Sequence, residues 1–187
     1  MRRVHATLLI LTLPLMAHAE PLRERVERAL SGIEHIPSQQ DLLRLGPGVD
    51  RVLQQIVARP SRRALARNRA ITLLRLFPSK ETAATLRRVI ETARKSKLGL
   101  DQLNLRQALT SYAVTHGPRS LGLLRPFLAH PSMDVRYDAA EAVRLSRSPA
   151  ALAVLQQRLG LERAPMVKHQ LQRQVELIQR PRPASRY

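Results

Sequence analysis

Cysteine is absent from this chain of 187 residues, which excludes disulfide bonds, thiolate zinc sites and a cysteine nucleophile. Glycine is scarce, with seven residues, and only 3% of residues are aromatic, so a β-sandwich or barrel with many tight turns is disfavoured. The shortage of aromatic rings also argues against a stacking platform for single-stranded nucleic acid. The length suits one ordinary domain, so these absences leave a helical protein without covalent cross-links.

Negative charge is scarce too. Only 14 acidic residues stand against 32 lysines and arginines, and the formal net charge is +18. Nearly all of the cations are arginine, which suits bidentate contacts with carboxylates or phosphates. The excess therefore indicates an anionic partner, and the other interpretation is a compositional bias of the genome combined with a solvated surface.

The first 19 residues have the three regions of a secretory signal peptide. Two arginines at positions 2 and 3 supply positive charge, residues 6–16 form an apolar run, and Ala-His-Ala at positions 17–19 is a small-x-small cleavage site. The run is interrupted by Pro14 and is too short for a transmembrane helix of ~20 residues. We therefore expect cleavage after Ala19, export to the periplasm or out of the cell, and no transmembrane segment in the mature chain.

Apolar residues recur with two helical spacings in the rest of the chain. Triplets spaced i, i+3, i+7 predict a series of first helices: Val49/Val52/Ile56, Ala83/Leu86/Ile90, Leu121/Leu124/Leu128 and Leu152/Leu155/Leu159. Triplets spaced i, i+4, i+8 predict a series of second helices: Leu22/Val26/Leu30, Ala66/Ala70/Leu74, Leu105/Leu109/Ala113, Val135/Ala139/Val143 and Val167/Leu171/Val175. The two series alternate, and units with a period in the thirties are typical of an α-solenoid.

The predicted organisation has four parts. Residues 1–19 are the signal peptide, and residues 20–46 are an N-terminal cap that contains one helix over 22–36. Residues 47–179 are four helix pairs, with a longer loop at 95–100 and helix caps at Asn104 and Asp134. Residues 180–187 carry arginines and prolines without an apolar face, so we expect a disordered basic tail.

The segment 130–143, which reads His-Pro-Ser-Met-Asp-Val-Arg-Tyr-Asp-Ala-Ala-Glu-Ala-Val, resembles a HEAT repeat. The second helix of that repeat typically opens with Asp-Val-Arg and continues with paired alanines, and residues 149–159 are similar to the first helix of a following repeat. The resemblance covers residues 47–179. It implies an all-α, right-handed α-solenoid of about four HEAT-like pairs with an N-terminal capping helix. HEAT proteins are curved scaffolds for other macromolecules, so it also implies a binding role.

A cation recurs at the second position of the second-helix stripes, at Arg23, Arg67, Arg106, Arg136 and Lys168. In the HEAT pattern such a cation commonly binds an acidic side chain or a carbonyl of the neighbouring unit, so the resemblance implies a structural ladder. The alternative is an anion-binding row along a groove, because an obvious local acidic partner is found only at position 134.

Another set of arginines indicates where a ligand would bind. The outward positions of the two N-terminal second helices carry four arginines and no acid, whereas the last two helices have mixed charges. If second helices line the concave side, as the resemblance implies, a positive groove lies toward the N-terminus. The predicted binding residues are Arg25, Arg28, Arg69 and Arg75.

Catalytic and metal-binding motifs are missing from the sequence. It contains no Gly-x-Ser-x-Gly, no glycine-rich phosphate loop and no His-Glu-x-x-His, and its histidines form no i, i+4 pair for zinc. Asp138 and Glu141 share a predicted helix face, but ordinary surface charge is the favoured interpretation of this pair. We therefore predict a protein that is not an enzyme and has no cofactor and no metal.

Three functions fit these observations. The favoured one is an exported scaffold whose basic curved surface binds an acidic protein or peptide. The alternative is binding to an anionic polymer, an envelope surface or nucleic acid, which the high positive charge favours. A DNA-acting enzyme is the third, because HEAT-like DNA glycosylases exist, but export and the absence of a recognisable base-flipping site argue against it and against a nucleic-acid partner.

Overall fold

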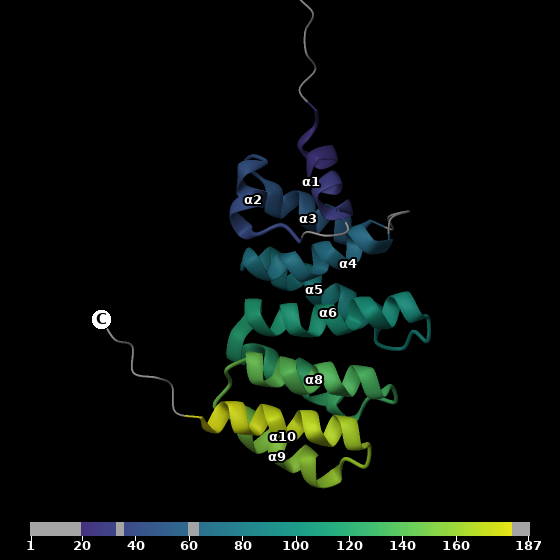
Figure 1. Ribbon diagram of the computed structural model, residues 1–187, viewed down its shortest axis with the longest axis vertical. Helices are drawn as coiled ribbons and strands as arrows, with labels where there is room; N and C mark the ends of the chain where they lie inside the picture. Colours follow the sequence, from purple (N-terminus) through teal and green to yellow (C-terminus); the bar gives the residue numbers. More distant parts are fainter. Residues whose placement is uncertain (1–19, 33–35, 60–63, 181–187) are drawn as a thin grey trace, which may run out of the picture.

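The computed structural model describes residues 20–32, 36–59 and 64–180, and these residues form helices and loops without a β-strand. The predicted signal peptide and the tail from residue 181 onward lie outside the described residues. In Figure 1 the helices follow one another in chain order, from α1 at the top to α9 and α10 at the bottom. The predicted all-α class is therefore confirmed for the described part of the chain.

The helices alternate along the chain and pack in pairs. The first half contains α1 (Leu22–Ser31), α2 (Gln39–Arg44), α3 (Val49–Ala58), α4 (Ala64–Leu73), the 3-10 helix η1 (Leu74–Leu76) and α5 (Lys80–Ala93). The second half contains α6 (Gly99–His116), η2 (Gly117–Ser120), α7 (Leu121–Leu124), η3 (Arg125–Ala129), α8 (Met133–Leu145), α9 (Ala151–Leu161) and α10 (Pro165–Gln179). The pairs in contact are α3 with α4, α5 with α6, the segment η2–α7–η3 with α8, and α9 with α10.

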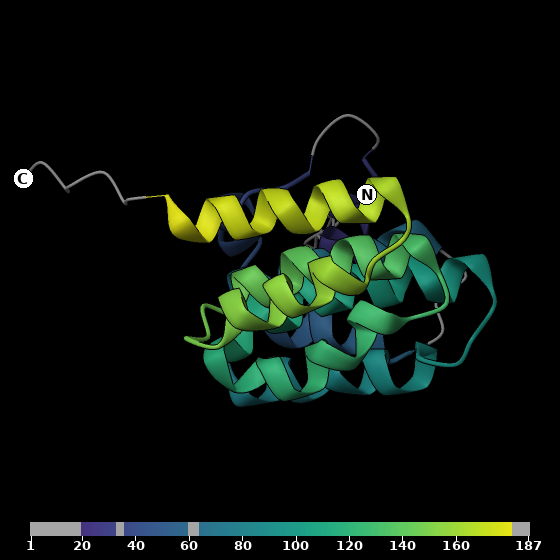
Figure 2. The ribbon, with the colours of Figure 1, turned by 90° about the horizontal axis from the view of Figure 1, so that it is seen from below.

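The second helices of the pairs connect each unit to the next. Helix α6 contacts α4 and α8, α8 contacts α10, and α1 contacts both α3 and α4. Figure 1 shows α4, α6, α8 and α10 one below another, and Figure 2 looks along this stack from its C-terminal end. A stripe on one second helix is therefore buried between its own pair and the neighbouring units.

The core is one continuous apolar cluster that extends through these units. The stripes predicted for the second helices form its centre, and every member is buried apart from Leu22, which is half-buried. Alanines are frequent where helices meet, as at Ala70, Ala113 and Ala139, which are fully buried. Small side chains let helix axes approach closely, so these positions fix the spacing between units.

The N-terminal cap differs from the prediction of one helix over 22–36. Helix α1 ends at Ser31, and the separate helix α2 begins after Ser38. The Ser38 hydroxyl accepts a hydrogen bond from the backbone N–H of Asp41, and the Asp41 carboxylate accepts one from the backbone N–H of Ser38. This capping box starts a new helix, and Pro37 disfavours helical backbone in the residue before it. The prediction of a single long helix is therefore wrong.

Both predicted helix caps are misplaced. Helix α6 begins at Gly99, so Asn104 is a buried residue inside it and accepts a hydrogen bond from the Asn68 side chain at 3.4 Å. Leu98 precedes α6 without a side-chain cap, and the Ser96 hydroxyl donates a hydrogen bond to Asp101 in the first turn of the helix. Asp134 lies in the first turn of α8, and Ser132 is the residue that precedes this helix.

The first helix of the third pair is not a continuous α-helix. The segment 117–129 consists of η2, the four-residue α7 and η3, with Pro118 in η2 and Pro126 in η3. Proline has no backbone N–H and clashes with the preceding turn, so two prolines in this short segment prevent regular α-helical hydrogen bonding. The irregular segment lies beside a groove along α5, which is described below.

Candidate binding groove

Three cations of the predicted ladder bind neighbouring helices. Arg67 donates to the carbonyl of Val57 in the last turn of α3, at 3.1 Å. Arg106 on α6 binds Asp138 on α8, with 2.5 Å between Nε and Oδ2. Arg136 on α8 binds Glu162 after α9. These guanidinium groups hold adjacent helices together. The other two differ, because Arg23 pairs with Glu27 within α1 and the Lys168 side chain is exposed.

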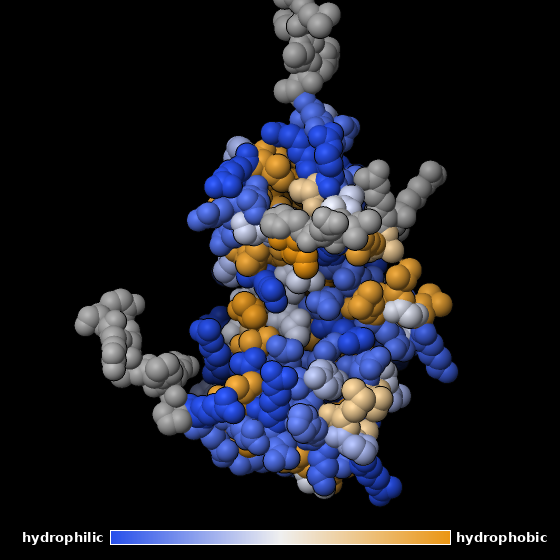
Figure 3. Space-filling model, viewed as in Figure 1, coloured by the Kyte–Doolittle hydropathy of each residue, from blue (hydrophilic) through white to orange (hydrophobic). Residues whose placement is uncertain are grey.

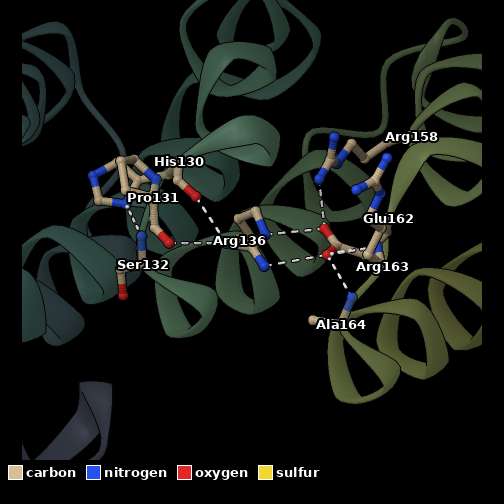
Figure 4. Close-up of polar contacts among 8 residues, drawn as sticks. All are labelled: His130, Pro131, Ser132, Arg136, Arg158, Glu162, Arg163 and Ala164. Carbon is tan, nitrogen blue, oxygen red and sulfur yellow. Dashed lines mark hydrogen bonds and ion pairs between the residues drawn. The ribbon is translucent and has the colours of Figure 1, made fainter.

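Glu162 is the most constrained acidic group in the described residues, and Figure 4 shows its surroundings. Its carboxylate, with a side chain only 3% exposed, accepts hydrogen bonds from Arg136, from Arg158 at 2.6 Å, and from the backbone N–H groups of Arg163 and Ala164. Burial alone would raise the pKa of Glu162. The hydrogen bonds and the charge of Arg136 outweigh it and lower the pKa to about 2.

The other half of the Arg136 guanidinium completes this cluster. Its Nη1 donates to the backbone carbonyls of His130 and Pro131, both at 3.0 Å, just before α8 begins (Figure 4). Arg136 therefore ties the start of α8 to the loop between α9 and α10. Apart from the buried Nε of Arg158, which has no hydrogen-bond partner, the charged groups of the cluster bind one another, which makes it a structural joint.

The four arginines predicted to bind a ligand do not share a cavity. Arg28 forms an ion pair with Glu20, and Arg69 donates to the carbonyls of Leu30, at 2.8 Å, and Gly32. Arg25 and Arg75 are exposed. None of the four lines the α5 groove described below or the other main hollows in the described residues. Arg69 instead satisfies carbonyl groups at the C-terminal end of α1, and binding of a ligand by the four arginines stays a prediction.

The face of the molecule that carries α4, α6, α8 and α10 is largely hydrophilic, with separate apolar patches (Figure 3). Asp138 and Glu141 lie on α8, and both pair with arginines: Asp138 with Arg106, and Glu141 with Arg144 at 3.8 Å. These carboxylates act as ion-pair partners of arginines.

A groove lies along α5, beside the irregular segment η2–α7–η3. It consists of two adjoining hollows of about 590 and 420 Å³, which share Arg87, Tyr112, His116 and Arg119 in their linings. We call these two hollows the α5 groove. Their volumes lie in the range of ligand-binding clefts in proteins.

Cations border the α5 groove on both sides. Lys80, Arg87 and Arg94 follow one another at intervals of seven residues, and we call them the α5 cations. Lys80 and Arg87 lie on α5, Arg94 directly follows its last residue with helical backbone, and Arg119 projects from η2. Glu91 is the one acidic residue among the described residues that line the groove. It pairs with Arg87 at 2.7 Å, but the two side chains are 60% and 55% exposed. An exposed pair of this kind is weak, so an incoming carboxylate can compete with Glu91 for Arg87.

The floor of the α5 groove is apolar and partly aromatic. Ala83, Ile90, Tyr112 and Phe127 line it and belong to the core, each no more than 6% exposed. The Tyr112 ring stacks on His116, with 5.0 Å between ring centroids. An apolar floor between a row of three cations and Arg119 is the arrangement expected for an amphipathic anionic ligand.

Tyr112 also offers a hydrogen-bonding group at this floor. Burial raises the pKa of its phenol, the charge of Arg87 lowers it and that of Glu91 raises it, and the net direction is upward. The phenol therefore keeps its proton at neutral pH and can donate a hydrogen bond to a ligand oxygen.

A third hollow, of about 440 Å³, lies beyond Arg94 and is lined by Lys95, Lys97 and His130. The guanidinium of Arg94 stands over the Phe127 ring at 5.7 Å from its centroid, a cation–π contact that links α5 to η3. Arg94 therefore marks the boundary between the α5 groove and this basic extension.

Sequence reasoning missed this groove, although two signals for it are present. The seven-residue interval between the three α5 cations places them on one helix face. Pro126, together with Pro118, predicts an interrupted helix opposite that face. Both signals need the neighbouring helix to be identified first, because neither indicates which elements are adjacent.

Within the described ranges no group of three or more histidine and acidic side chains is placed to hold a metal ion. None of the helices in the described part of the chain has the length and apolar character that crossing a bilayer requires.

Comparisons of the chain with protein-family models, curated proteins and solved structures give no match.

Proposed function

We propose that this protein is an exported, non-enzymatic scaffold of HEAT-like repeats that binds an acidic protein or peptide segment in the α5 groove. The observation that carries the proposal is the lining of that groove, where Lys80, Arg87, Arg94 and Arg119 surround an apolar floor and Glu91 is the one acid among the described lining residues. Such a lining complements a ligand with both carboxylate and apolar side chains.

The repeat part of the proposal is supported by the packing of the units. Helices α4, α6, α8 and α10 contact one another consecutively, and the polar contacts between units recur, as in the pairs Arg106–Asp138 and Arg136–Glu162. A right-handed α-solenoid would produce both features, because each unit buries its stripe against the next.

The export part rests on the N-terminal pattern alone. Positive charge, an apolar run and Ala17-His18-Ala19 together favour cleavage before Glu20. N-terminal sequencing of protein recovered from the extracytoplasmic fraction should begin at Glu20, and an intact Met1 in that fraction would contradict this part.

A macromolecular ligand fits the groove better than a small anion. Lys80 begins α5 and Arg94 directly follows its last residue with helical backbone, so the two are fourteen residues apart, which corresponds to about 21 Å along the helix axis. One phosphate or carboxylate group would reach a single cation of this row. An extended chain with several acidic residues reaches all of them, and its apolar side chains lie over the floor.

Binding of a labelled peptide of alternating glutamate and leucine tests the proposal. The groove variant replaces three lining cations by glutamine, and the control variant replaces three exposed arginines that line none of the hollows described. The groove substitutions are Lys80→Gln, Arg87→Gln and Arg119→Gln. The control substitutions are Arg88→Gln, Arg163→Gln and Arg173→Gln.

Both variants lose the same net charge, so they separate a located site from a general effect of charge. We expect the groove variant to bind the peptide about tenfold more weakly, since each exposed ion pair contributes a fraction of a kcal/mol, and the control variant to bind almost as well as the parent. Equal losses in both variants would contradict a groove site. A third variant, Arg25→Gln with Arg75→Gln, tests the site predicted from sequence in the same assay.

Tighter binding to anionic polymers than to the acidic peptide is the outcome that would contradict the proposed function. If duplex DNA, polyphosphate or anionic vesicles bind more tightly than the acidic peptide, and the groove and control variants weaken that binding alike, the positive charge acts as a whole. Such binding would fall steeply with salt concentration, because it depends on the release of counterions. That outcome would replace the scaffold proposal by polyanion binding.

A further inference from the structure

The α5 cations set a distance that a ligand must match. An α-helix rises 1.5 Å per residue, so Lys80, Arg87 and Arg94 recur at intervals of about 10 Å along one face of α5. All three line the α5 groove. A chain that lies along the groove can pair with all three only if its acidic side chains point to the same side at about this interval.

A β-strand does not match this interval. A strand rises about 3.3 Å per residue and turns successive side chains to opposite faces, so its same-face positions recur at about 7 Å and about 13 Å. Acidic residues on one face of a strand would therefore fall out of step with the three α5 cations.

An α-helical ligand has a matching interval but suits the floor less well. Acidic residues seven positions apart on a helix would also lie about 10 Å apart. A helix with its side chains is about 10–12 Å across, however, and Tyr112 and Phe127 at the floor are only 4% and 3% exposed. A slender extended chain can approach such a floor more closely than a helix can.

The polyproline II conformation matches both the interval and the width. It has three residues per turn and rises about 3.1 Å per residue, so every third side chain returns to the same face about 9 Å further along. It is a single slender chain without internal hydrogen bonds. Proline-rich segments in this conformation are recognised by aromatic-lined grooves. The α5 groove has Tyr112, His116 and Phe127 in its lining.

We infer that the α5 groove binds an extended polyproline II segment of a partner protein in which an acidic residue recurs at every third position. The carboxylates pair with Lys80, Arg87 and Arg94, and Arg119 binds from the opposite side. Proline or apolar residues between the acids lie over the floor at Tyr112. The inference rests on the proposed function, because it specifies the ligand of the same groove.

Peptides of about twelve residues and equal charge test the inference by fluorescence anisotropy. The first repeats Glu-Pro-Leu, the second has the same composition with its glutamates contiguous, and the third replaces proline by alanine and places its glutamates at positions that share one helix face. Circular dichroism of the free peptides shows whether each has the intended conformation. The parent protein is compared with Arg87→Gln and with Arg88→Gln, which changes the adjacent, exposed residue on the same helix.

We expect the Glu-Pro-Leu peptide to bind about tenfold more tightly than the contiguous peptide, because it forms several ion pairs at once. Arg87→Gln should weaken its binding a few-fold, and Arg88→Gln should leave it nearly unchanged. Equal affinity for the three peptides would overturn the every-third-residue spacing of the acids but leave acidic-peptide binding in place. Tightest binding of the helical peptide would overturn the polyproline II conformation of the ligand. If no acidic peptide binds, the proposed function itself fails.

Discussion

Arg136 and Glu162 form a two-pronged ion pair between α8 and the loop that follows α9. The distances are 2.9 Å between Nε and Oε2 and 3.2 Å between Nη2 and Oε1, and the side chains are 14% and 3% exposed. Arg158 approaches the same carboxylate from α9. One carboxylate therefore binds two arginines at the junction of the last two helix pairs.

Removing the charge of Glu162 should destabilise the protein strongly. Glu162→Gln leaves Arg136 and Arg158 half-buried without their acidic partner, and loss of one member of a buried ion pair costs about 3–5 kcal/mol. Urea unfolding followed by circular dichroism measures the change. Glu91→Gln is the control, because its exposed pair with Arg87 should contribute less than about 1 kcal/mol. Equal losses would mean that the Glu162 cluster is no structural joint.

The free energy of unfolding should also fall at acidic pH, because Glu162 becomes protonated. The pKa of Glu162 is lowered from 4.5 to about 2 in the folded protein, so the unfolded chain takes up a proton first as the pH falls. The stabilisation is present above about pH 4.5 and is lost as the pH falls to about 2, and it amounts to roughly 3 kcal/mol at neutral pH.

The pH effect is measured as the difference in unfolding free energy between the parent and Glu162→Gln. Other carboxylates titrate in both proteins, so the difference isolates this group. It should be largest at neutral pH and should shrink toward pH 2. A difference that stays constant between neutral pH and pH 2 would show that Glu162 titrates normally in the folded state.

The close approach of second helices can be tested at Ala139. This residue is fully buried in α8, which contacts both α6 and α10. Ala139→Leu adds volume where there is no space, so we expect a loss of ~1–3 kcal/mol in thermal or urea unfolding. Ala153→Leu on the exposed side of α9 should change stability by less than about 0.5 kcal/mol. Similar shifts for the two variants would contradict close packing at Ala139.

Apolar periodicity predicted the helical core because the spacing of apolar residues within one helix is enough to show which face of that helix is buried. The triplet Leu105/Leu109/Ala113 is fully buried in α6, and Val135/Ala139/Val143 is fully buried in α8. Helix boundaries were predicted less well, because they depend on short polar contacts such as Ser38–Asp41 and Ser96–Asp101. Several residue types can make such contacts, so the sequence alone does not indicate which pair forms.

The candidate site could not be predicted because it depends on which helices are neighbours. Outward helix positions pointed to Arg28 and Arg69, but whether an arginine is free depends on partners elsewhere in the fold. Arg28 pairs with Glu20 but its side chain is 73% exposed, so the pair is weak, whereas the carbonyls at the end of α1 occupy Arg69. The α5 groove likewise requires the segment η2–α7–η3 to lie beside α5, and no local pattern contains that information.

Arg69 and Arg75 test whether contacts elsewhere in the fold decide if an arginine is free to bind a ligand. Arg69→Met removes the donors that reach the carbonyls of Leu30 and Gly32 but keeps an apolar stem, so it should cost about 1–3 kcal/mol by leaving hydrogen bonds to a charged group unmade. Arg75→Met removes the same charge from an exposed position and should cost less than about 0.5 kcal/mol. Thermal unfolding of both variants measures the difference. If both losses are small, the Arg69 contacts do not hold α1 in solution, and the N-terminal arginines become available to a ligand as the sequence predicted.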